Sequence, residues 1–83
     1  MGYEAEYRKA AEKYLDRLEK STKQRIIDAV DKLPEGNVVK LKSREGYRLT
    51  VGSYRIVYNY KTSKGKEIID VLLIGPRGDI YKK

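Results

Sequence analysis

The chain has 83 residues and a formal net charge of +7, from 19 basic and 12 acidic side chains. It contains no cysteine and no histidine, which excludes a disulfide framework, the common zinc-binding sets and the usual side chain for proton transfer near neutral pH. A chain of this length forms one domain, 1–83, in which any catalysis must use tyrosine, lysine, arginine or carboxylates.

The first residues and the distribution of charge indicate a location and a kind of partner. The opening MGYEAEYRK carries charges where a signal peptide needs an apolar core, and no apolar run approaches the roughly 18 residues of a membrane span, so we expect a cytoplasmic protein. Residues 34–83 hold eleven basic and five acidic side chains, against eight and seven in residues 1–33. This one-sided excess indicates a polyanionic partner, nucleic acid first and an acidic protein second.

Hydrophobic spacing predicts a short strand followed by two helices. Residues 3–7 alternate tyrosine or alanine with glutamate, as in a strand with one buried face. Residues 8–19 change to helical spacing. Ser21 followed by Gln24 fits a capping box for a second helix, which we expect to stop at Pro34. The short link requires the two helices to fold back as an antiparallel hairpin.

The rest of the chain predicts a basic connection and three further strands. Residues 34–46 lack a clear period, and we expect only a short extended piece at 38–41. Strands are predicted at 46–52, 53–60 and 67–74, with KTSKGK as a flexible hairpin loop that its lysines keep solvated. One N-terminal strand, two helices and three strands predict an α+β fold, with the helical hairpin on one face of a mainly antiparallel sheet of about four strands.

The stretch YRLTVGSYRIVY, residues 47–58, predicts its own pairing. A two-residue turn at Gly52-Ser53 places glycine at the first central position, as a type II′ turn requires. Alternate residues of both arms then point toward the helices. The residues expected on that buried face are Tyr47, Leu49, Val51, Tyr54, Ile56 and Tyr58.

The same register sends two arginines to the opposite face. Arg48 lies opposite Val57 and Arg55 opposite Thr50, so the arginines are diagonal neighbours about 7–8 Å apart. Like charges this close are solvated, pair with a carboxylate such as Asp70 or Asp79, or clamp a phosphate, whose oxygens a guanidinium group matches bidentately.

Three segments together carry a resemblance to a known family. The opening AEYRKAAEKYLDRL, the hairpin YRLTVGSYRIVY and the closing IGPRGDIY resemble the RelE/ParE toxin superfamily of type II toxin–antitoxin systems over essentially the whole chain. The resemblance implies the RelE-like microbial RNase fold. In the RelE branch it further implies a ribosome-dependent mRNA endonuclease that uses the RNA 2′-hydroxyl as nucleophile, with neither metal nor cofactor, and that is neutralised by a cognate antitoxin protein.

The resemblance also assigns roles by position. Arg48, Arg55, Arg77 and Tyr81 match the catalytic positions of the RelE branch, with the arginines on the phosphate and Tyr81 as the candidate base. The residues expected to contact RNA or the ribosome are Lys40, Lys42, Arg44, Lys82 and Lys83.

Two departures from the family pattern leave alternatives open. Thr50 stands where several RelE-like enzymes carry a second lysine, and Pro76 stands where many members have histidine. Each removes a group able to transfer protons. The alternatives are a ParE-like toxin that inhibits DNA gyrase by binding, and a toxin-fold protein with weak or no catalysis.

Overall fold

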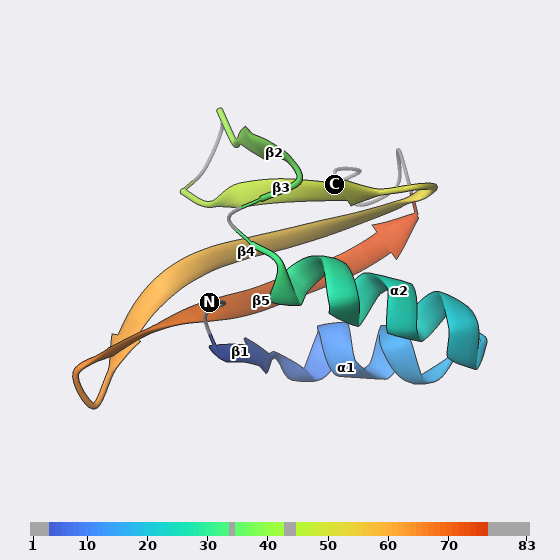
Figure 1. Ribbon diagram of the computed structural model, residues 1–83, viewed down its shortest axis with the longest axis horizontal. Coiled ribbons are helices and arrows are strands. Elements are labelled where there is room, and N and C mark those ends of the chain that lie inside the picture. The colour runs from blue at the N-terminus through green and yellow to red at the C-terminus, as the bar shows by residue number, and fades with distance from the viewer. Residues whose placement is uncertain (1–3, 34, 43–44, 77–83) are drawn as a thin grey trace.

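The computed structural model describes residues 4–33, 35–42 and 45–76, in which two helices cover one face of a five-stranded sheet (Figure 1). The strand order is β1-β5-β4-β3-β2; β1 runs parallel to β5, and the other neighbours are antiparallel. This is the α+β fold that the sequence predicts. The elements are β1 (Glu4–Tyr7), α1 (Lys9–Asp16), α2 (Lys20–Asp31), β2 (Asn37–Lys40), β3 (Tyr47–Val51), β4 (Tyr54–Ser63) and β5 (Lys66–Pro76).

Helix α1 is shorter than the 8–19 predicted, because both of its ends are held by backbone contacts. Arg8 stays extended as the N-cap (φ −64, ψ 160), and its backbone N–H donates to the carbonyl of Val71 in β5 at 2.9 Å. At the other end, the N–H of Leu18 donates to the carbonyl of Leu15 at 3.0 Å, which closes a tight turn. None of the described helices is long and apolar enough to cross a membrane.

The predicted capping box of α2 is wrong. The helix begins at Lys20 with the extended Glu19 as N-cap and no side-chain cap bond, so Ser21 lies inside the first turn. Gln24 instead donates its amide to the carboxylate of Asp28, one turn later, at 2.9 Å. The tight link after α1 leaves Glu19 extended, so the helix starts before Ser21 can cap it. Pro34, the predicted stop, lies outside the described residues.

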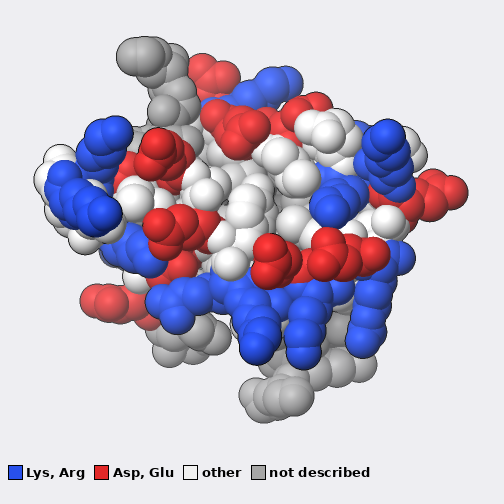
Figure 2. Space-filling view, turned by 90° about the horizontal axis from the view of Figure 1, so that it is seen from below, with Lys and Arg blue, Asp and Glu red and all other residues white. Residues whose placement is uncertain are grey.

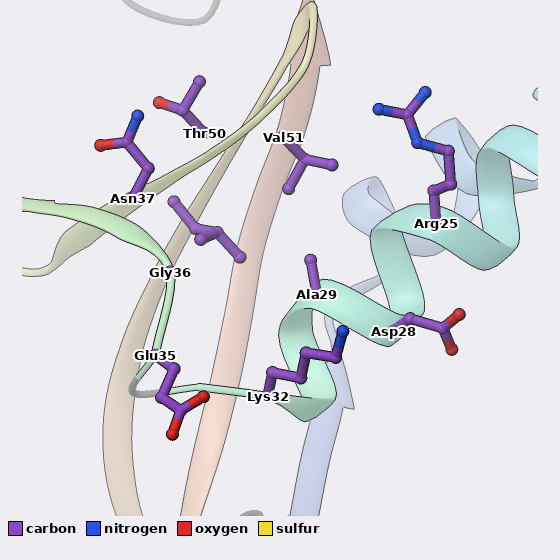
Figure 3. A pocket seen from close by; sticks show the side chains of 10 residues that line it. Arg25, Asp28, Ala29, Lys32, Glu35, Gly36, Asn37, Thr50 and Val51 are labelled. Carbon is purple, nitrogen blue, oxygen red and sulfur yellow. The ribbon is translucent and has the colours of Figure 1, made fainter.

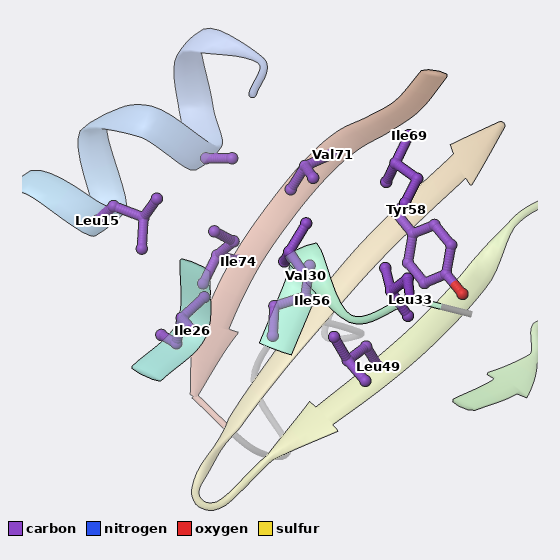
Figure 4. Close-up of a cluster of buried hydrophobic side chains, with 11 residues drawn as sticks. Leu15, Ile26, Val30, Leu33, Leu49, Ile56, Tyr58, Ile69, Val71 and Ile74 are labelled. Atoms are coloured by element: carbon purple, nitrogen blue, oxygen red, sulfur yellow. The ribbon is translucent and has the colours of Figure 1, made fainter. Parts of the chain in front are cut away.

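The core lies between the two helices and the sheet (Figure 4). The predicted inward-facing residues of β3 and β4 all take part: Leu49, Ile56 and Tyr58 are buried, while Tyr47, Val51 and Tyr54 pack at the margin. The cluster comprises Ala11, Leu15, Ile26, Val30 and Leu33 from the helical segment, and Leu49, Ile56, Tyr58, Ile69, Val71 and Ile74 from the sheet.

The β3–β4 hairpin has the predicted register. Tyr47 pairs with Tyr58 and Val51 with Tyr54, with every intermediate pair as expected. Gly52 has φ 57 whereas Ser53 has no positive φ, as a type II′ turn requires. The pairing of β4 with β5 shifts by one residue at a bulge between Val57 and Tyr58.

Three strands pair or extend further than the sequence predicts. The extended piece expected at 38–41 is a true strand, β2, whose pairing with β3 raises the strand number from about four to five. β4 continues to Ser63 and β5 begins at Lys66, so KTSKGK is mostly paired strand and only Lys64-Gly65 forms the turn. Polar residues hid this extension, because a ribbon without a buried face needs no hydrophobic alternation.

Candidate functional site

The face of the sheet opposite the helices, called the outer face here, carries both arginines of the hairpin. Arg48 pairs with Val57 and Arg55 with Thr50, and paired residues of a sheet project to the same side. The inward residues Leu49 and Ile56 alternate with them and lie in the core. The alternation therefore places the two guanidinium groups together on the outer face, as the sequence predicts.

The arginines of the outer face are half-buried and closely spaced. Their diagonal relationship puts them about 7–8 Å apart at the backbone. The Nε atoms of Arg48 and Arg55 are both shielded from solvent, and that of Arg55 has no hydrogen-bond partner among the described residues. A buried donor without a partner costs about 1–3 kcal/mol, so the Nε of Arg55 is a donor that an anion would satisfy.

The backbone around Arg55 leaves the guanidinium group uncovered on the β5 side and adjoins a tight turn on the β3 side. Its partner on β5 is Gly75, which has no side chain to cover the guanidinium group. On the β3 side, the turn at Gly52 lies under the side chain of Arg25, whose Nη2 is 3.1 Å from where a glycine Cβ would be. The turn at Gly52 sets the register of β3 and β4, and that register places Arg48 and Arg55 on the outer face.

The carboxylates farther along the sheet are engaged by other cations. Asp70 is 6% exposed and accepts two hydrogen bonds from Arg8, both of 2.9 Å. These bonds lower the pKa of Asp70 below its usual value and raise the pKa of Arg8. Lys61 pairs with Glu6 across β5 at 2.7 Å. Asp70, which the sequence offered as a partner for the hairpin arginines, is therefore committed to Arg8.

The surface is not uniformly basic. Viewed from below, on the side of α1 and β1, the molecule shows acidic and basic side chains in adjacent bands (Figure 2). Such an arrangement is typical of an ordinary solvated surface. The outer-face arginines are half-buried, whereas most of the other described lysines and arginines are exposed.

The other predicted site residues are placed as follows. Lys40 pairs with Tyr47 and so projects to the helix side of the sheet, whereas its neighbour Val39 lies opposite Arg48. Both Lys40 and Lys42 are exposed. The structure thus does not bring Lys40 to the arginines. Predicted residues outside the described ranges are Arg44, Arg77, Tyr81, Lys82 and Lys83, and Asp79 is outside them as well.

Tyr7 and Tyr58 are packing residues rather than proton-transfer groups. Burial is the main cause that raises the pKa of Tyr7 to about 12, and burial also raises the pKa of Tyr58. The ring of Tyr58 stacks on that of Tyr47 with 5.5 Å between the ring centroids, and it meets the ring of Tyr60 edge-on with the centroids 5.7 Å apart. A phenol with a raised pKa stays protonated near neutral pH and cannot act as a base there.

A groove that sequence reasoning missed lies between α2 and the β2–β3 edge of the sheet (Figure 3). It measures about 500 Å³, with Leu49, Val51 and Ala29 as apolar lining and charged residues of both signs along α2. Its residues come from three separate segments, so no local pattern marks it. The lining consists of Arg25, Asp28, Ala29, Lys32, Glu35, Gly36, Asn37, Leu49, Thr50 and Val51.

Comparison with known proteins identifies the class and then the family. The fold is similar to that of a chain in the crystal structure of the RelBE2 toxin–antitoxin complex from Mycobacterium tuberculosis, with a TM-score of 0.72 and 16% identity over 93% of this chain and 100% of that chain. The family described as ParE toxin of type II toxin–antitoxin system, parDE, matches residues 5–81. The chain therefore belongs to the ParE toxin family, within the superfamily that its sequence resembles. A search of curated proteins gave no match.

Proposed function

We propose that this toxin is an endoribonuclease that cleaves messenger RNA on the ribosome, with Arg48 and Arg55 holding the scissile phosphate. The observation that carries the proposal is the buried Nε of Arg55, which has no partner among the described residues. Arg55 is diagonal to a second arginine on the same face of the hairpin and pairs with a glycine on β5. Guanidinium groups bind phosphate oxygens bidentately. Their fixed position suits them to charge that develops during a reaction.

The chemistry needs no group from outside the RNA except a base and an acid. The 2′-oxygen attacks the adjacent phosphorus while its proton passes to a base; the bond from phosphorus to the 5′-oxygen breaks, and that oxygen takes up a proton. The products are a 2′,3′-cyclic phosphate and a 5′-hydroxyl. Extra negative charge builds on the pentavalent phosphorus, and the arginines stabilise that charge more than the ground state.

The proton-transfer groups are assigned by the resemblance. Arginine is a poor acid or base because its pKa lies above about 12. Arg77 and Tyr81 would complete the site, with Tyr81 as the base. Alignment of the 2′-hydroxyl by the ribosome supplies part of the rate, since orientation alone contributes several kcal/mol.

The proposal includes a cognate antitoxin and ribosomal contacts. The antitoxin presents an acidic, partly helical segment that covers the outer face or displaces the C-terminal segment, because an acidic chain complements a basic surface. Lys40, Lys42, Arg44, Lys82 and Lys83 remain the proposed contacts to RNA or the ribosome, although Lys40 projects to the helix side of the sheet, away from the arginines.

A second candidate is a binding toxin that inhibits DNA gyrase. Two observations favour it: the matching family is that of ParE toxins, and Thr50, directly opposite Arg55, supplies no proton-transfer group. In this case the outer-face arginines would contact a protein partner and no covalent step would occur.

A single set of reactions separates the two functions. The parent and the variants Arg48→Ala, Arg55→Ala and Arg17→Ala are incubated with a programmed ribosome, with free mRNA, and with gyrase and plasmid DNA. Arg17 is an exposed arginine that caps α1 in the helix layer, so its variant matches the loss of charge. We expect the parent and Arg17→Ala to cut ribosomal mRNA at the codon in the decoding site, and both hairpin variants to lose about 10²–10³-fold in rate. Gyrase–DNA adducts with intact mRNA would overturn the nuclease in favour of the second candidate.

A further inference from the structure

The β4–β5 hairpin extends beyond the rest of the sheet. β3 pairs with β4 only as far as Tyr58, and β1 pairs with β5 from Ile68 onward. Residues 62–67, called the hairpin tip here, therefore pair with each other but with no other described strand. In Figure 1 the tip forms a narrow two-stranded arm that projects beyond β1, on the side away from the helices.

The turn at the end of this arm holds a lysine at a position whose backbone conformation favours asparagine or glycine. Lys64 has φ 53 and Gly65 has φ 80, as in a type I′ turn, in which Asn-Gly is the preferred pair. Among the described residues, Lys64 is the sole non-glycine with a positive φ. A lysine there costs about 1 kcal/mol of backbone energy. A local rule broken in this way points to a use for the side chain.

Lys66 of the tip lies on the same side of the sheet as the arginines. Lys66 pairs with Ser63, two residues beyond Lys61, so all three project to the outer face. Glu67 pairs with Thr62 and so projects to the opposite face. Lys64 and Lys66 are exposed and make no ion pair with any described residue, whereas Lys61 is held by Glu6.

Apart from its charges and hydroxyl groups, the tip has no side chain suited to a protein interface. Its residues are Thr62, Ser63, Lys64, Gly65, Lys66 and Glu67, none of which presents a large apolar side chain for a protein interface. A two-stranded ribbon carrying two exposed ammonium groups and the hydroxyl of Ser63 fits the phosphate backbone of a nucleic acid, where such groups position the protein without reading sequence.

We propose that the hairpin tip, through Lys64 and Lys66, is a second RNA contact that binds phosphates separate from the one at Arg48 and Arg55. The inference depends on the proposed RNA substrate. Ser63 is eight residues from Arg55 along β4, about 26 Å at 3.3 Å per residue, so the tip cannot reach the same phosphate. The tip adds affinity only, while the arginine site carries out the cleavage.

The test uses a double variant, Lys64→Asn with Lys66→Gln, and a matched control, Lys9→Gln with Lys13→Gln on the exposed side of α1. Each lowers the net charge by two, from +7 to +5. Asparagine suits a positive φ, so the tip variant should keep or raise the melting temperature, and any loss of binding is not a loss of folding.

Binding is measured against salt with two probes, a fluorescent single-stranded RNA and a programmed ribosome. Loss of two phosphate contacts makes the slope of log K against log salt less steep by about 1.4–1.8. This change corresponds to roughly 20-fold weaker binding of the tip variant at 0.15 M salt, and the difference from the parent disappears near 1 M salt. The control should keep the parental slope. Loss on both probes identifies the RNA strand as the contact, and loss on the ribosome alone identifies ribosomal RNA.

The outcomes separate this inference from the proposed function. The tip variant should cleave at the parental rate once saturated on the ribosome, whereas Arg55→Ala should not. If the tip variant and the control bind both probes alike, the tip contact is refuted while cleavage by the arginine site stands. If the parent binds RNA through the tip but never cleaves, the nuclease is refuted and the tip contact stands.

Discussion

Replacement of Gly52 by alanine tests whether the hairpin turn depends on backbone conformation or on packing. Gly52 has φ 57, and a Cβ there would lie 3.1 Å from the Nη2 atom of Arg25. An L-residue in this conformation costs about 1–2 kcal/mol. The contact adds little, because Arg25 is an exposed, flexible side chain that can move aside. We expect Gly52→Ala to lower the free energy of unfolding by about 1–2 kcal/mol, or the melting temperature by about 5–15 °C for a domain of this size.

A double-mutant cycle with Arg25→Ala distinguishes the two causes. Urea unfolding of the parent, both single variants and the double variant gives the coupling between the sites. If the backbone is responsible, the losses add and Arg25→Ala does not rescue Gly52→Ala. Gly52→Asn should cost less than Gly52→Ala, because asparagine tolerates a positive φ. Full stability of Gly52→Ala, or full rescue by Arg25→Ala, would refute the reasoning.

Two further predictions concern buried ionisable groups. Asp70→Asn should be destabilising at neutral pH, because the hydrogen bonds from Arg8 lower the pKa of Asp70. The stability that these bonds contribute is present above the unfolded pKa of 3.8 and is lost as the pH falls through the lower folded pKa. Urea unfolding curves of the parent and the variant should therefore converge in acid. Tyr7→Phe should leave stability within about 0.5 kcal/mol of the parent or raise it, because the Tyr7 hydroxyl is buried without a partner among the described residues. The pKa of Tyr7 is raised from 10.0 to about 12, so the unfolded chain ionises first and the parent loses stability as the pH rises from 10 to 12. Denaturation across that window should show a smaller loss of stability in Tyr7→Phe than in the parent, and an equal loss would contradict the assignment.

The local pattern of the chain determined the hairpin and the faces of its residues. Alternation from Tyr47 to Tyr58, interrupted by the apolar Val57, and a glycine at the one position that needs a positive φ favour a single register, since a slip of one residue would expose the core. Arg48 and Arg55 could therefore be assigned to the outer face from alternation alone. The two helices could be predicted as well, because apolar residues recur at helical spacing in both segments.

Long-range contacts decided what no local pattern contains. Arg8 binds Asp70 across 62 residues of sequence, and β1 joins the sheet by pairing with the last strand. β2 becomes a strand because β3 offers it an unpaired edge. The hairpin tip extends because β4 and β5 continue to bond to each other after their neighbours end. Sequence thus determined which side each residue of a local element faces, while tertiary structure decided which elements meet, because that depends on partners distant along the chain.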